Sequence, residues 1–173
     1  MNKQRWSIKY ICLIGLLTAL LVTISIVTMF VKIGDSAFQI TTGLYLVFCY
    51  FVPGYGMLLC GIVYGAIMDL VLNSIITMWL TILINILMFL LMRYGSKIFT
   101  KHLAMIIASS LVFLYIQFLY YVVWNNQDIS ARNGLVIKEA IVDAIQWSIS
   151  IIAFEVIYFT LTKTKLSEKL SNF

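Results

Sequence analysis

Six apolar stretches separated by short polar breaks fill almost the whole chain, and they limit its fold more than any other feature. Most of them approach the roughly 20 residues that a helix needs to cross the hydrocarbon core of a bilayer. They lack the two-residue alternation of membrane β-strands, so helices are expected. Hydrophobic residues make up 62% of the 173 residues and charged residues only 11%, which is too apolar for one soluble core. The sequence therefore predicts an all-α integral membrane protein.

We expect a single domain, residues 1–173, with six transmembrane helices. The predicted spans are 8–30, 37–52, 56–74, 77–98, 102–124 and 136–162. The second and third are short, and a tight turn at residues 53–56 separates them. Residues 125–134 are polar and form the only long loop expected. The first span is too long for a signal-peptide core and no clear cleavage site follows it, so we expect it to be retained.

Basic residues are distributed unevenly between the two sides of these spans. With the N-terminus inside the cell, nine fall on the cytoplasmic side: Lys3, Arg5, Lys9, Arg93, Lys97, Lys101, Lys163, Lys165 and Lys169. Three fall outside: Lys32, Arg132 and Lys138. This bias follows the positive-inside rule and predicts that both the N- and the C-terminus are cytoplasmic.

Polar side chains inside three spans are candidates for function, because placing them in a bilayer is costly. Residues three or four apart share a helix face, and each of these spans carries such a row. The rows are Thr77, Thr81 and Asn85; Gln117, Tyr121 and Trp124; and Glu139, Asp143, Gln146 and Ser150. In the predicted topology the rows lie at similar depth near the outer side. We therefore expect one shared cavity that opens to the outside.

Aromatic side chains near these rows add a second type of ligand contact. Their rings would stack on a flat ligand while the amides and Asp143 bind its edge. The residues expected to bind substrate are Trp79, Thr81, Asn85, Gln117, Tyr121, Trp124, Glu139, Asp143, Gln146 and Trp147. Another interpretation stays open: Trp and Tyr are common at membrane interfaces, and Thr, Asn and Gln form bonds between helices.

Small residues form rows on the first and third spans. Gly15 and Ala19 are four residues apart on the first, and Gly61 and Gly65 lead to Asp69 on the third. Such rows let helices approach closely. We expect the third-span row to pack inside the protein, whereas the first-span row suits internal packing or a partner protein.

Several kinds of chemistry have no support in the sequence. A phosphate-binding loop, an H-E-x-x-H motif and a G-x-S-x-G motif are all missing. Cys12, Cys49 and Cys60 lie in apolar runs without metal-type spacing, and His102 lies alone at a span boundary. We therefore expect no metal, no cofactor and no enzymatic activity. Glu155, on another face of the sixth span, is expected to meet another helix or to stay protonated.

Three short motifs resemble the substrate-binding (S) components of energy-coupling factor (ECF) transporters. They are Lys32-Ile33-Gly34-Asp35-Ser36, Phe51-Val52-Pro53-Gly54-Tyr55-Gly56 and Gly61-x-x-x-Gly65-x-x-x-Asp69-Leu70. The first two are similar to the branch associated with pyridoxine or hydroxymethylpyrimidine. Asp143-x-x-Gln146 looks like a variant of an Asn-x-x-Gln pattern of the family. The fourth span departs from the branch, because Thr77-Met78-Trp79 stands where a proline-containing motif would be expected.

The resemblance implies an S-component fold of six helices in a bacterial or archaeal plasma membrane. The last three helices would bind a small water-soluble vitamin or precursor near the outer side, under a capping loop that contains Lys32, Gly34 and Asp35. Gly15 and Ala19 would contact a transmembrane coupling subunit that works with two cytoplasmic ATPases, and the S component would topple in the membrane during transport. Aspartate in place of asparagine at position 143 favours a ligand with a donor or a positive charge.

Two other functions fit parts of the sequence. Scaffolds of the rod-shape-determining membrane family also carry a Gly-x-x-x-Gly-x-x-x-Asp helix, but a scaffold needs no ligand cavity. A free-standing solute carrier usually has internal repeats and broken helices, and the sequence contains no repeat. A polar cavity formed by the last three helices would therefore favour the S component.

Overall fold

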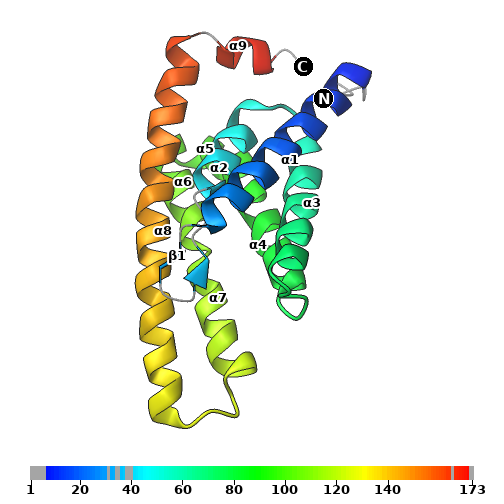
Figure 1. Cartoon of the computed structure of the whole chain (residues 1–173). Coiled ribbons are helices and arrows are strands. Elements are labelled where there is room, and N and C mark those ends of the chain that lie inside the picture. Colours follow the sequence, from blue (N-terminus) through cyan, green and yellow to red (C-terminus); the bar gives the residue numbers. More distant parts are fainter. Residues whose placement is uncertain (1–6, 31, 34–35, 38–40, 165, 172–173) are drawn as a thin grey trace.

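The structure is a computed structural model that describes residues 7–30, 32–33, 36–37, 41–164 and 166–171, with the backbone alone for residues 32–33, 36–37, 167, 169 and 171. Figure 1 shows a bundle of helices with a small hairpin after the first. The elements are α1 (Ile8–Met29), β1 (Lys32–Ile33), β2 (Ser36–Ala37), α2 (Thr41–Phe51), α3 (Gly56–Val71), α4 (Met78–Leu90), the π-helical turn η1 (Leu91–Gly95), α5 (Ser96–Ile98), α6 (Lys101–Ser110), α7 (Phe113–Phe118), the π-helical turn η2 (Leu119–Val123), α8 (Ile129–Lys163) and α9 (Leu166–Ser171). Strands β1 and β2 pair antiparallel.

Four helical stretches in the described part of the chain are long and apolar enough to cross a membrane. They are Ile8–Met29, Met78–Ile98, Lys101–Val123 and Ile129–Lys163. The two shorter apolar helices are Thr41–Phe51 and Gly56–Val71. The all-α fold class expected from the sequence is confirmed, and the six apolar helical stretches coincide with the six expected spans to within a few residues at most ends.

The start of α8 differs from expectation. Residues 129–134, predicted as part of a long loop, are helical, and α8 runs for 35 residues. The Arg132 guanidinium lies 4.1 Å from the ring centre of Tyr120 in η2, a cation–π contact that joins this first turn to the neighbouring helix. The loop prediction was wrong because polarity alone does not reveal such a contact.

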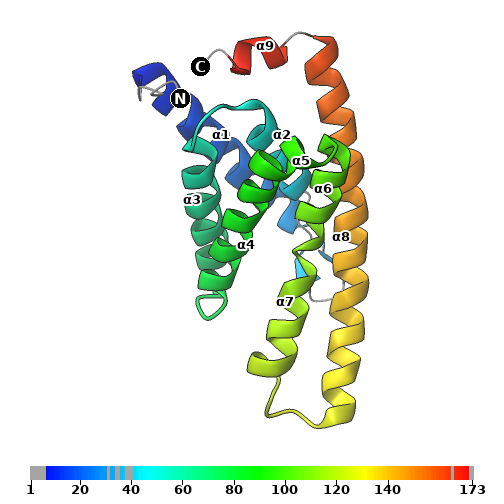
Figure 2. The same ribbon diagram turned by 180° about the vertical axis from the view of Figure 1, so that it is seen from behind.

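Both ends of the described chain lie at the same end of the bundle. In Figures 1 and 2, the start of α1, the α2–α3 turn and α9 are at one end, and the α3–α4 turn and the α7–α8 connection are at the other. The hairpin of η2 and α8 extends beyond the α3–α4 turn in both views.

The α2–α3 turn is held by a side chain from α1. The Tyr10 hydroxyl donates to the Pro53 carbonyl at 2.6 Å and accepts from the Gly56 amide at 2.9 Å. Gly54 has a φ of 76°, a conformation that favours glycine. The tight turn expected from the Pro-Gly pair is therefore present.

Helices α2 and α8 cross in direct backbone contact. A Cβ atom added to Gly43 would lie 2.3 Å from the carbonyl oxygen of Ser150. Only glycine fits there, and the contact holds the middle of α8 against the centre of the bundle.

Candidate functional site

A cavity of about 370 Å³ lies among α3, α4, the α6–α7 segment and α8. This size is within the roughly 300–1,000 Å³ of small-molecule sites. Its lining consists of Thr42, Tyr64, Gly65, Met68, Asp69, Leu72, Ser74, Thr81, Ile84, Asn85, Met88, Val112, Tyr115, Glu139, Asp143 and Gln146. The wall combines apolar side chains with hydroxyls, amides and carboxylates, as binding sites for polar organic molecules do.

Half of the substrate-binding residues expected from the sequence meet at this cavity. They are Thr81, Asn85, Glu139, Asp143 and Gln146. All five lie on α4 or α8, which are regular helices over these positions, so residues three or four apart do share a face.

The other five expected residues do not line the cavity: Trp79, Gln117, Tyr121, Trp124 and Trp147. Trp79 is 54% exposed and Tyr121 is 70% exposed. Trp79 packs edge to face on Phe118, and Trp147 packs on Phe113. The fifth predicted span is interrupted: turns bonded from residue i to i+3 separate α6 from α7, and η2 is π-helical. The α-helical spacing that joined Gln117, Tyr121 and Trp124 in one row therefore does not apply there.

Asp69 and Tyr115 line the cavity but were not among the expected binding residues. Asp69 was assigned to the small-residue row, although an ionisable side chain in an apolar span is itself a functional signal. Tyr115 lies near the carboxyl groups of Asp69, Glu139 and Asp143. An aromatic residue in an aromatic-rich span gives no comparable signal.

Two carboxyl groups in the lining are almost completely buried. Asp69 and Asp143 are each 5% exposed. One oxygen of each, Oδ2, is buried without a hydrogen-bond partner among the described residues. Thr81 interacts with the Asp69 carboxylate. The described lining contains no Lys, Arg or His, so the cavity is acidic.

Asn85 also has a packing function. The side-chain nitrogen of Asn85 donates to the Gly61 carbonyl at 3.0 Å, and the backbone carbonyl of Asn85 accepts from the Tyr45 hydroxyl at 3.1 Å. A Cβ added to Gly65 would lie 2.7 Å from the Asn85 nitrogen, and one added to Gly61 would lie 2.2 Å from the Tyr45 hydroxyl oxygen. The third-span row therefore packs inside the protein, as expected.

The first-span row is exposed, whereas the third-span row is packed. Gly15 and Ala19 are both exposed on α1. A Cβ added to Gly15 would meet no atom within 4 Å. This row therefore takes no part in packing within the described chain.

The expected capping loop is described only in part. Lys32 lies in β1, where its backbone pairs with Ala37 of β2. Gly34 and Asp35 lie outside the described residues.

Glu155 meets another helix, one of the two alternatives that the sequence left open. Its Oε1 lies 2.5 Å from Nδ1 of His102 at the start of α6. Both side chains are more than 40% exposed, so this contact contributes little to stability.

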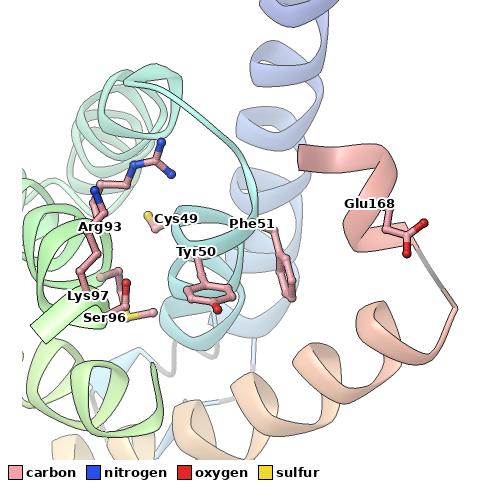
Figure 3. A pocket seen from close by; sticks show the side chains of 8 residues that line it. Cys49, Tyr50, Phe51, Arg93, Ser96, Lys97 and Glu168 are labelled. Carbon is pink, nitrogen blue, oxygen red and sulfur yellow. The ribbon is translucent and has the colours of Figure 1, made fainter. Parts of the chain in front are cut away.

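A second cavity, of about 610 Å³, lies at the end of the bundle that carries α9 (Figure 3). Its lining residues are Cys49, Tyr50, Phe51, Met92, Arg93, Ser96, Lys97 and Glu168. None of the expected site residues is among them. Within the described residues, no group of three or more His, Cys, Asp or Glu side chains is suited to hold a metal ion in either cavity.

Comparisons with protein-family models, with curated proteins and with solved structures find no match. The case for a function therefore depends on the geometry of the cavity and on the motifs in the sequence.

Proposed function

We propose that the chain is the substrate-binding subunit of an ECF-type uptake transporter. It captures a small water-soluble vitamin or precursor outside the cell. It then delivers this solute together with a transmembrane coupling subunit and two cytoplasmic ATPase subunits. The single observation that carries the proposal is the acidic cavity in which Thr81, Asn85, Glu139, Asp143 and Gln146 come together.

The proposal includes six membrane crossings with both chain ends in the cytoplasm of a bacterial or archaeal cell. Helices α2 and α3 are shorter than a full crossing and lie against longer ones. Basic residues support this orientation: Lys9, Arg93, Lys97, Lys101 and Lys163 lie in elements at the α9 end of the bundle, and Arg132 and Lys138 lie in the first turns of α8 at the other.

The exposed row on α1 supports a partner subunit. Gly15 and Ala19 leave a shallow strip beside the exposed side chains of Leu16 and Leu20. A helix of a coupling subunit can approach such a strip closely. A scaffold of the rod-shape-determining type is the alternative, and it would have no use for the acidic cavity.

The test is a thermal-shift screen of the detergent-purified chain against pyridoxine, hydroxymethylpyrimidine, thiamine, riboflavin and niacin. A ligand that binds only the folded state raises its stability by about 2.7 kcal/mol at a hundred times its dissociation constant. One clear hit supports a solute-binding protein and identifies its substrate. No hit with a well-folded protein favours the scaffold, and co-purification with cell-shape proteins would then be the next measurement.

A further inference from the structure

Two helices that are distant in sequence each contribute a buried carboxylate to the same cavity. Asp69 comes from α3 and Asp143 from α8, and each is 5% exposed. The Oδ2 atoms of both are without a hydrogen-bond partner among the described residues, and both residues line the 370 Å³ cavity. Both of these unsatisfied acceptor atoms therefore belong to residues that line one cavity.

Burying these carboxylates costs free energy that the described residues offset only in part, through the contact of Thr81 with Asp69. A buried charge normally has an opposite charge beside it, and none of the described lining residues is basic. Asp69 also lies in the last turn of α3, where the helix dipole is negative and disfavours another negative charge. A third acidic residue, Glu139, adds to the negative potential. A cation in the cavity would compensate the charges of Asp69 and Asp143.

The size and lining of the cavity indicate what kind of cation fits. A cavity of about 370 Å³ is far larger than a bare ion, and the described acidic residues are not grouped closely enough to hold a metal. Apolar side chains form the rest of the wall: Met68, Leu72, Ile84, Met88 and Val112. The lining is thus suited to a molecule that has both a positive group and an apolar body.

We infer that this cavity binds a small organic cation, with its positive group in the space that the carboxylates of Asp69 and Asp143 line and its apolar part against the methionine and isoleucine side chains of α3 and α4. The inference rests on the proposed solute-binding function and specifies the class of substrate. Charge-assisted hydrogen bonds to a carboxylate are roughly twice as strong as neutral ones, so charge gives the site most of its selectivity.

The experiment compares ligands that match in shape and differ in charge. The purified full-length chain is tested by thermal shift and calorimetry with pyridoxamine against pyridoxine and with choline against 3,3-dimethyl-1-butanol. Asp69→Asn and Asp143→Asn are tested beside the wild-type chain. The control is Asp128→Asn, because Asp128 is an exposed carboxylate outside the cavity.

We expect at least one cation to bind more tightly than its neutral partner. Either cavity substitution should lower that affinity roughly tenfold or more, and the control should not. Tighter binding of a neutral or anionic compound, or cation binding that is unchanged in both cavity variants, overturns the inference and leaves the proposed function standing. No shift with any of these compounds or with the vitamin panel, in protein that unfolds cooperatively, overturns both.

Discussion

The side-chain nitrogen of Asn85 lies 3.0 Å from the carbonyl oxygen of Gly61, and this bond joins α4 to α3 at the wall of the acidic cavity. An amide that bonds to a helix backbone inside an apolar bundle stabilises the contact between the two helices. The same residue lines the cavity, so its substitution should affect folding as well as any ligand.

Replacing Asn85 with Ala should destabilise the folded chain by about 1–3 kcal/mol, because the Gly61 carbonyl loses its side-chain donor and a small void forms. Thermal unfolding in detergent without ligand measures this directly. Gln117→Ala is the control, since Gln117 is exposed on α7 and lies outside the cavity. Equal melting temperatures for the two variants would mean that the Asn85 bond does not hold α3 and α4 together.

Two glycines in different surroundings, Gly61 in α3 and Gly15 in α1, should respond oppositely to the same change. Gly61→Ala should destabilise the protein, because the new Cβ would lie 2.2 Å from the hydroxyl oxygen of Tyr45. Gly15→Ala should be neutral or stabilising by up to about 1 kcal/mol, because it meets no atom within 4 Å and alanine favours the helix. Chemical or thermal denaturation of both variants gives the comparison. A loss of stability at Gly15 would show that α1 packs differently from the structure described above.

A larger side chain on α1 should separate assembly from ligand binding. We expect Gly15→Leu to prevent co-purification with the proposed coupling subunit while ligand affinity stays at the wild-type value. Gly134→Leu is a matched control, because Gly134 is also an exposed helical glycine with no atom within 4 Å of an added Cβ. Normal vitamin uptake by cells that carry Gly15→Leu would remove this face from the proposed interface.

Removing a buried charge should stabilise the protein that has no ligand. Asp69→Asn and Asp143→Asn keep the shape of each side chain and remove a desolvated carboxylate, which we expect to stabilise the folded state by about 1–3 kcal/mol. The readout is the melting temperature in the absence of any added solute, with Asp128→Asn as the reference. Lower melting temperatures in both cavity variants would indicate that these carboxylates support the fold rather than a ligand.

The sequence predicted the helices better than the site, and particular residues explain the difference. Apolar runs alone set the bounds of α1, expected at 8–30 and observed at Ile8–Met29. On α4 and α8 the helical period correctly placed Asn85 and Asp143 at one cavity. Gln117 lies beyond a break in the fifth apolar stretch, and two serines next to that break are too few to predict it within a run that continues apolar on both sides.

Asp69 shows a second limit of sequence interpretation. Its spacing from Gly61 and Gly65 fits a packing row, and that interpretation is correct for the two glycines. The aspartate continues the row in sequence, yet its side chain lines the cavity. One row of residues can therefore serve two purposes, and only the arrangement of α3, α4 and α8 distinguishes them.

The backbone contact between Gly43 and Ser150 also limits which helices can move relative to one another. Two helices in such contact cannot slide past one another without losing it, so α2 and α8 form one rigid wall. The bond between Asn85 and Gly61 joins α3 and α4 into a second. The remaining wall is α7, which is separated from α6 by the turn at Leu111–Val112 and followed by the π-helical η2. A rotation of α7 about that turn would leave both of these helix–helix contacts intact.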